Sequence, residues 1–164
     1  MSEMTKLMKL LTDIRSDPDK SLISSPGDRT ASKLLVFANF AVGLASLSTC
    51  KRTKVGSIVV PQDLSEVLAI GYNGPPAGLP NNQCRDRVGD CGCVHSEANA
   101  MVKLRTRARD LVFIATVSPC EACAGLIINS KAIATVVYLE EYRNRAGLDL
   151  LEETGILAVK IAGE

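Results

Sequence analysis

The stretch His95-Ser96-Glu97-Ala98-Asn99-Ala100, followed downstream by Ser118-Pro119-Cys120-Glu121-Ala122-Cys123, carries the most information in this sequence. Imidazole nitrogen and thiolate sulfur are typical zinc ligands, and a catalytic zinc site keeps three protein ligands and one position open to water. His95, Cys120 and Cys123 supply these three ligands. Glu97 remains beside them as a carboxylate that could transfer protons.

The spacing of these residues predicts where helices begin. Positions i and i+2 of a regular helix point about 200° apart, so His95 and Glu97 converge only if His95 stands at the very start of a helix. Cys120 and Cys123 share one face of a helix that Pro119 would open at its first position. Both ligand segments then lie at helix N-termini, where the positive end of the dipole favours the thiolate that zinc needs.

H-x-E followed by P-C-x-x-C is the signature of zinc deaminases that act on nucleobases. Zinc brings the pKa of a bound water to about 7, and Glu97 would pass the water proton to the ring nitrogen and then to the leaving ammonia. Cys120 and Cys123 could instead form a redox dithiol, or zinc could be purely structural. The dithiol leaves His95, the only histidine of the chain, unexplained, and neither alternative gives Glu97 a role.

Length and composition predict one globular domain in a reducing compartment. The 164 residues are 46% hydrophobic and 23% charged, and the net charge of +1 gives no general attraction to nucleic acid or to a membrane. No stretch approaches 18 apolar residues, and the N-terminus lacks the pattern of a secretory signal. Six cysteines without such a signal predict a cytoplasm, that of the host cell if a phage encodes the chain.

Apolar periodicity predicts an α/β fold. A first amphipathic helix over 4–14 precedes a connector over 16–30, and could dock on its own core or on a neighbouring subunit. The remaining prediction, in chain order, is helix 34–47, strands 55–60 and 67–72 around a turn at 61–63, loop 73–94, helix 96–106, strand 111–117, helix 119–129, strand 132–139, helix 148–154 and strand 159–161. A hairpin followed by alternating helices and strands predicts a mixed sheet with helices on its faces. A loop as long as 73–94 usually serves function.

Five segments resemble one family: Ser48-Thr49-Cys50-Lys51-Arg52, Val55-Gly56, Gly71-Tyr72-Asn73-Gly74-Pro75-Pro76-Ala77-Gly78, His95-Ser96-Glu97-Ala98-Asn99-Ala100 and Ser118-Pro119-Cys120-x-x-Cys123. They resemble deoxycytidylate (dCMP) deaminases of the phage and bacterial type, in the cytidine deaminase superfamily. The resemblance covers 34–161 and implies a three-layer α/β/α fold with a mixed five-stranded sheet, here in a deaminase domain over 31–164. Ser96 stands where the family usually has alanine, and residues 1–30, an N-terminal helix and connector, are longer than usual.

The resemblance implies zinc-dependent conversion of dCMP to dUMP and ammonia, which supplies dTTP synthesis. His95, Cys120 and Cys123 would hold zinc, and Glu97 would move protons. The implied substrate-binding residues are Tyr142 over the pyrimidine, Arg105 or Arg107 on the phosphate, Ser118 and Asn73. Tyr142 could instead be a half-buried residue at a strand end, and either arginine could belong to the solvated end of a helix.

The resemblance also implies regulation by dCTP as activator and dTTP as inhibitor, bound with Mg²⁺, in a homo-oligomer that we expect to be a hexamer. The residues assigned to this site are Gly71, Tyr72, Asn73, Gly74, Lys51, Arg52 and Lys54. Glycines there would let backbone amides approach phosphates. Asn73 could serve this site, touch the substrate sugar, or only form a turn, and the sequence leaves these roles open.

The other four cysteines are Cys50, Cys84, Cys91 and Cys93. They could be free thiols, or they could bind a second, structural zinc, since four thiolates form a closed tetrahedral site. Two further hypotheses remain for the whole chain. It could deaminate a free nucleoside or a polynucleotide, or it could be a zinc-stabilised interaction module, which would have no need for Glu97.

Overall fold

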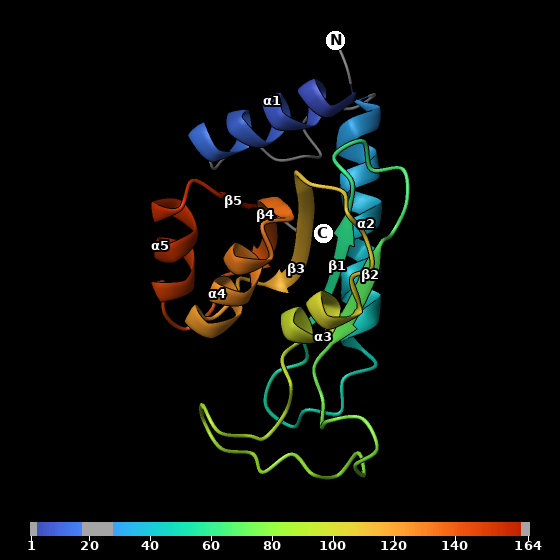
Figure 1. Cartoon of the computed structure of the whole chain (residues 1–164), viewed down its shortest axis with the longest axis vertical. Coiled ribbons are helices and arrows are strands. Elements are labelled where there is room, and N and C mark those ends of the chain that lie inside the picture. The colour runs from blue at the N-terminus through green and yellow to red at the C-terminus, as the bar shows by residue number, and fades with distance from the viewer. Residues whose placement is uncertain (1–2, 18–27, 162–164) are drawn as a thin grey trace.

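The structure, a computed structural model, describes residues 3–17 and 28–161. Within these ranges the chain forms five helices and five strands (Figure 1). In chain order these are α1 (Glu3–Ser16), α2 (Arg29–Ala45), β1 (Gly56–Val60), β2 (Ala69–Tyr72), α3 (Ser96–Lys103), β3 (Leu111–Val117), α4 (Glu121–Ser130), β4 (Ile133–Glu140), α5 (Ala146–Glu153) and β5 (Leu157–Lys160).

The strands form one mixed sheet in the order β2-β1-β3-β4-β5. β1 pairs antiparallel with β2 and β3, whereas β3, β4 and β5 run parallel. The carboxyl ends of β3 and β4 therefore lie at the same edge of the sheet as the end of β2 and the start of β1. We call it the C-terminal edge. The loops 73–95, 118–120 and 141–145 all leave from it.

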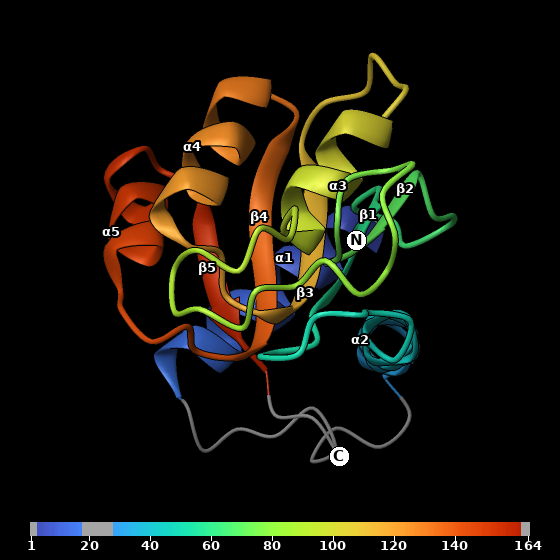
Figure 2. The same cartoon turned by 90° about the horizontal axis from the view of Figure 1, so that it is seen from below.

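Helices cover both faces of the sheet (Figure 2). α1 and α2 pack on one face, over a core that includes Ile58, Ile114 and Val137. α3, α4 and α5 cover the other face, where Phe113 and Val136 are fully buried. Side chains of β1 and β3 are buried on both faces because both carry helices. The predicted three-layer α/β/α fold is confirmed.

The first helix docks on its own chain. Leu7 and Leu11 are fully buried in the core that α1 shares with α2 and β5, and Arg15 forms an ion pair with Glu152 of α5. Docking on the chain's own core was one of the two predicted possibilities. Residues 18–27 of the predicted connector and the side chain of Met4 lie outside the described residues. The division of the chain at residue 30 stays a prediction.

Two helix boundaries differ from the prediction by three residues or more, each with a local cause. α2 starts at Arg29 instead of residue 34, because the Asp28 carboxylate accepts a hydrogen bond from the Thr30 amide at 2.8 Å and caps the helix. α3 ends at Lys103 instead of residue 106, because Leu104 takes an extended conformation, with ψ of 118°.

The sequence has no apolar stretch long enough to predict a membrane-spanning helix. Among residues 3–17 and 28–161, the helices are too short or too polar to span a bilayer.

The sheet and α2 approach each other closely at Gly56. A Cβ atom at Gly56 would lie 2.0 Å from the Ala41 carbonyl oxygen and 2.6 Å from the Ala45 amide nitrogen, both backbone atoms of α2. Glycine at this position thus fixes the distance between β1 and the helix above it.

We expect Gly56→Ala to lower the free energy of unfolding by about 1–3 kcal/mol, because the added methyl group must push α2 away from the sheet. Gly43→Ala is the matched control: it lies within α2 and a Cβ there would meet no atom within 4 Å. The control should be neutral or stabilising by up to about 1 kcal/mol. Urea unfolding of both variants measures the difference, and equal stability would contradict the packing argument.

Candidate metal centre and nucleotide site

His95 stands at the N-cap of α3, with extended backbone angles of −68° and 153°. Val94, immediately before it, pairs with Gly74 through two backbone hydrogen bonds of 2.8 and 3.2 Å. Cys120 is the N-cap of α4, with angles of −70° and 168°. The predicted positions at the starts of two helices are therefore observed, although α4 begins at Glu121 and not at Pro119.

The side chains of His95, Cys120 and Cys123 converge. Nδ1 of His95 lies 3.4 Å from Sγ of Cys120 and 3.5 Å from Sγ of Cys123, and the three ligand atoms lie within 4.8 Å of one another. Zn–S bonds of about 2.3 Å and Zn–N bonds of about 2.0 Å in a tetrahedron separate nitrogen from sulfur by about 3.5 Å. The cluster therefore has the dimensions of a three-ligand zinc site.

The Cys120 thiol favours the charged form that zinc binds. Hydrogen bonds with Cys123 and with His95 lower the pKa of Cys120 to about 4, against the opposing effect of burial. Its place at the start of α4 adds the positive end of the helix dipole.

Glu97 lies in the first turn of α3 and is only 4% exposed. Burial raises the pKa of this carboxyl above its usual value. The hydroxyl of Ser96, itself fully buried, donates a hydrogen bond of 2.9 Å to Oε2 of Glu97. A buried carboxylate held beside a metal-type cluster can accept and return a proton without exchanging it with bulk water.

The close approach of α3 to the sheet depends on Gly71. A Cβ atom there would lie 2.0 Å from the Ser96 carbonyl oxygen and 2.7 Å from the Ala100 amide nitrogen. The side-chain amide of Asn99 donates to the Tyr72 carbonyl at 2.9 Å. These contacts place the start of α3, with His95 and Glu97, over the end of β2.

Ser118 ties the ends of β3 and β4 together. Its amide donates to the Glu140 carbonyl at 2.8 Å, and its hydroxyl accepts a hydrogen bond from the Tyr142 amide at 2.8 Å. Tyr142 is half-buried beside the segment that leads to Cys120. In this structure the buried Ser118 hydroxyl orients the β4–α5 loop.

Gly147 is a site-forming residue that the sequence analysis missed. A Cβ atom at this position would lie 2.1 Å from the Pro119 carbonyl oxygen and 2.9 Å from the Cys120 carbonyl carbon. The start of α5 thus packs directly on the metal-ligand segment. A glycine in the first turn of a helix, where it costs helix stability, was the available signal.

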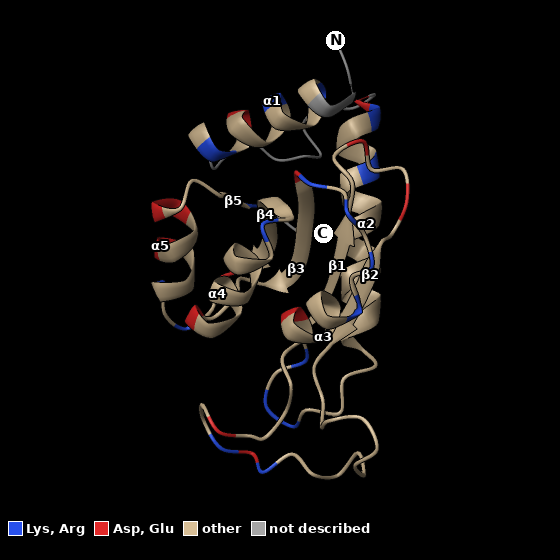
Figure 3. Cartoon of the chain, viewed as in Figure 1, with Lys and Arg blue, Asp and Glu red and all other residues tan. Residues whose placement is uncertain are grey.

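Arg105 and Arg107 were predicted to bind the substrate phosphate, but the structure places them elsewhere. Both are exposed residues between α3 and β3, in a basic segment that runs away from the cluster to the opposite edge of the sheet (Figure 3). β3 alone spans about 20 Å between this segment and Ser118. The Arg105 guanidinium folds back and donates to the Val102 carbonyl at 2.7 Å. Within one chain these arginines do not reach the cluster, and their role in phosphate binding stays a prediction.

Asn73 is buried, and its side chain holds the loop that follows β2. Oδ1 accepts hydrogen bonds from the Ser48 hydroxyl at 2.7 Å and the Val55 amide at 2.8 Å. Nδ2 donates to the Thr53 carbonyl at 2.7 Å. Asn73 therefore joins the segments before β1 and after β2, and one amide hydrogen remains without a described acceptor.

The other four cysteines also converge. Sγ of Cys50 and Sγ of Cys84 are 3.8 Å apart, and the ligand atoms of Cys50, Cys84, Cys91 and Cys93 lie within 4.8 Å of one another. Two sulfurs on one tetrahedral zinc are separated by about 3.8 Å, whereas a disulfide needs about 2.05 Å. All four are free thiols. Backbone hydrogen bonds from Lys51 and Asp86 lower the pKa of Cys84 to about 7.

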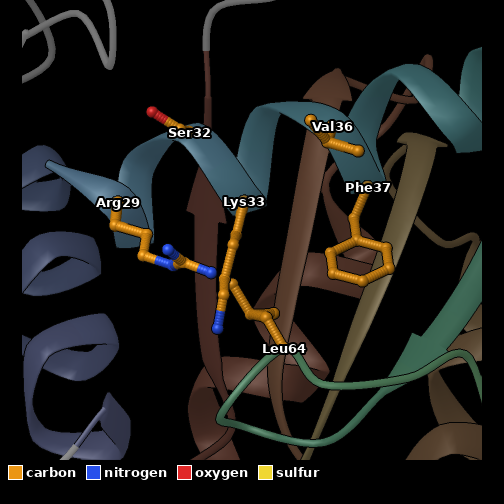
Figure 4. Close-up of a pocket in the computed structure, with 6 residues that line it drawn as sticks. All are labelled: Arg29, Ser32, Lys33, Val36, Phe37 and Leu64. Atoms are coloured by element: carbon orange, nitrogen blue, oxygen red, sulfur yellow. The ribbon is translucent and has the colours of Figure 1, made fainter. Parts of the chain in front are cut away.

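A separate pocket lies on α2, on the other face of the sheet (Figure 4). It is lined by Arg29, Ser32, Lys33, Val36, Phe37 and Leu64. The Lys33 ammonium group donates to the Asp63 carbonyl at 3.1 Å. Among these residues there is no metal-ligating group or carboxylate, so the pocket lacks the chemistry of the His95 cluster.

Comparison with known proteins agrees with the fold and the cluster. Residues 31–140 match the sequence profile of the cytidine and deoxycytidylate deaminase zinc-binding region. This match covers both halves of the His95–Cys123 cluster. The fold and the site therefore define a zinc-binding deaminase domain.

Similar proteins indicate which family of zinc-binding deaminases this chain belongs to. Deoxycytidylate deaminase of Mycobacterium phage D29 is 36% identical over an alignment of 123 residues, and the match covers 64% of this chain and 92% of that protein. Deoxycytidylate deaminase of Saccharomyces cerevisiae is 31% identical over 133 residues, and the match covers 73% of this chain but only 42% of the yeast protein. The crystal structure of dCMP deaminase from cyanophage S-TIM5, in complex with dCMP and dUMP, superposes with a TM-score of 0.69 at 33% identity, covering 77% of this chain and 94% of that one. The chain belongs to the deoxycytidylate deaminase family.

Proposed function

We propose that this protein hydrolyses dCMP to dUMP and ammonia, and thereby supplies dUMP for dTTP synthesis. The observation that carries the proposal is the buried Glu97 carboxylate next to the cluster of His95, Cys120 and Cys123. A structural zinc site or an interaction module would have no use for a buried carboxylate there. The S-TIM5 relative, with dCMP and dUMP bound, supports the choice of nucleotide.

His95, Cys120 and Cys123 would hold the zinc, which when bound supplies a Lewis acid that brings the pKa of water to about 7. Glu97 accepts a proton from the attacking water as the bond from oxygen to C4 of the pyrimidine forms. It delivers this proton to the ring nitrogen, then accepts the second proton from the hydroxyl now on C4 and delivers it to the amino group. The bond from C4 to the amino nitrogen breaks as the carbonyl forms, and ammonia is released. Tyr142, fixed by Ser118, would provide an aromatic surface for the pyrimidine.

Glu97→Gln should abolish turnover and retain zinc and dCMP binding, because the amide is nearly isosteric but cannot accept or return the proton. The measurement is ammonia release from dCMP, CMP, deoxycytidine and single-stranded DNA, with metal content and dCMP affinity determined on the same preparation. We expect a loss of at least about 100-fold, in the range typical of general acid–base catalysis. Near wild-type activity of the variant would refute the assigned role, and wild-type preference for DNA would refute the substrate.

We further propose that Cys50, Cys84, Cys91 and Cys93 bind a second, structural zinc. The spacing of 3.8 Å between the Cys50 and Cys84 sulfurs supports it. Cys93 lies two residues before His95. Sγ of Cys84 accepts a hydrogen bond from the Lys51 amide at 3.4 Å. The metal would therefore link three segments of the loops at the C-terminal edge.

Elemental analysis of purified protein should give about two zinc per chain. Cys84→Ala should reduce this to about one and lower the melting temperature, because a structural zinc contributes folding free energy. His95→Ala is the matched variant: it should also retain about one zinc but lose activity. One zinc per chain with four titratable thiols in the native wild type would exclude the second site.

We also propose that dCTP with Mg²⁺ activates the protein and that dTTP inhibits it, through the loop after β2. Lys51, Arg52 and Lys54 are exposed cations near this loop and could bind a triphosphate. The Gly74–Val94 pairing leads directly to His95, so a displacement of the loop would reach the metal ligand. The side chain of Asn73 forms three hydrogen bonds within the protein, so in this proposal it holds the loop in position and does not bind the effector directly.

The two nucleotides should change activity in opposite directions, by about 5- to 150-fold, the usual range of allosteric coupling. Arg52→Ala should weaken both responses and leave activity without effectors unchanged. Lys160→Ala, which removes an exposed cation from β5, is the control. Dose–response curves of dCMP deamination measure the effect, and curves that stay flat in the wild type would show an unregulated enzyme.

For assembly we propose a homo-oligomer, with a hexamer as the expected form. Exposed apolar side chains on α2, α3 and α4 support it; they include Val36, Phe40, Val42, Val102 and Leu126. We place the protein in a cytoplasm, because none of its six cysteines is paired in a disulfide, as is usual in reducing compartments.

A further inference from the structure

We infer that Arg143 binds the 5′-phosphate of the substrate and so makes the site select a nucleotide over a nucleoside. This inference rests on the proposed dCMP deaminase function and names a residue that the sequence analysis had not assigned. Within one chain Arg105 and Arg107 lie at the opposite edge of the sheet, so a phosphate bound near the cluster needs another cation.

The position of Arg143 is fixed by contacts that also form the metal centre. It lies in the loop 141–145, between β4 and α5. Before it, the Tyr142 amide donates to Ser118 at 2.8 Å. After it, Gly147 in the first turn of α5 packs against Pro119 and Cys120. The loop is therefore attached at both ends to the segment that carries the metal ligand.

These attachments limit the distance between the loop 141–145 and the segment that carries Cys120. Ser118 and Cys120 are two residues apart, so at most about 7 Å separates their Cα atoms. Arg143 directly follows Tyr142, whose amide is bound to Ser118, so the backbone of Arg143 lies near the segment that carries Cys120, and Arg143 supplies no metal ligand itself. A nucleotide requires such an arrangement, because its base would lie at the cluster and its phosphate would lie away from it.

The guanidinium group of Arg143 contacts one residue of its own loop and approaches one residue of the long loop. Cζ of Arg143 lies 5.3 Å from the centre of the Tyr142 ring, within the range of a cation–π contact. One terminal nitrogen lies so close to Gly89 of the long loop that a Cβ atom there would be 3.3 Å from it. Gly89 also has a positive φ of 74°. Arg143 therefore stands between the aromatic residue proposed for the base and the loop 73–94.

The charge of Arg143 is available for a ligand. Neighbouring arginines are neutralised: Arg145 pairs with Glu141, Asp149 and Glu152, and Arg85 pairs with Asp90. Arg143 has no ion pair with a carboxylate in the described part of the chain, and it is exposed. A planar guanidinium held against an aromatic ring can present two parallel N–H groups to a phosphate.

The test compares kcat/KM for dCMP and for deoxycytidine in wild type, Arg143→Ala, Arg143→Lys and Arg105→Ala, on zinc-loaded protein. Arg143→Ala should lower kcat/KM for dCMP by about 10- to 100-fold, mainly through KM, which is the effect expected for a charge-assisted hydrogen bond. Deoxycytidine should be affected less than about 2-fold. Arg143→Lys should recover part of the loss, and Arg105→Ala, the same charge removed at the far edge, should resemble wild type.

Inorganic phosphate provides a second measurement. It should compete with dCMP in the wild type and compete more weakly in Arg143→Ala. The inference is overturned if Arg143→Ala keeps the wild-type preference for dCMP, or if it loses activity equally on both substrates, as a purely structural residue would. A wild type that deaminates deoxycytidine as well as dCMP would overturn the proposed nucleotide function, and this inference with it. Thermal unfolding of each variant checks that the fold is retained.

Discussion

The site depends on two places where backbone touches backbone without an intervening side chain. At Gly71, α3 lies against β2, and a Cβ atom would be 2.0 Å from the Ser96 carbonyl oxygen. At Gly147, α5 lies against the ligand segment, and a Cβ atom would be 2.1 Å from the Pro119 carbonyl oxygen. These contacts bring the starts of two helices to one edge of the sheet. Since ligand positions in a zinc site must be accurate to fractions of an ångström, this packing is a condition for the chemistry.

The parallel arrangement of β3 and β4 explains why that edge can host a reaction. Parallel strands place their carboxyl ends side by side, and the loops that follow them meet there. Ser118 uses both its amide and its hydroxyl to join the two ends. Local sequence thus provides a ligand and an aromatic residue, and the sheet places them together although more than twenty residues separate Cys120 from Tyr142 in the chain.

Much of the fold and the metal cluster could be predicted from the sequence, because those features depend on short spacings. The interval of two residues in His95–Glu97 works only at a helix start, and the interval of three in Cys120–Cys123 places both thiols on one face of a helix. The structure has both pairs at helix starts. The residue that we propose for phosphate binding could not be predicted in this way. Arg105 follows the helix of His95 closely in sequence, but α3 and the turn after it carry the chain to the far edge. Arg143 is distant in sequence and is placed by tertiary contacts with Ser118 and Gly147.

The distribution of charge gives a physical reason for a small substrate. With a net charge of +1, the chain has no general field that would attract a polynucleotide. Two arginines near the C-terminal edge are neutralised by carboxylates: Arg85 pairs with Asp90, and Arg145 pairs with three carboxylates. A single guanidinium without a carboxylate partner, as at Arg143, can recognise one phosphate, whereas a polynucleotide requires a series of cations along its backbone. Selection for a mononucleotide would then arise from which cations are left unpaired, and not from how many cations the chain contains.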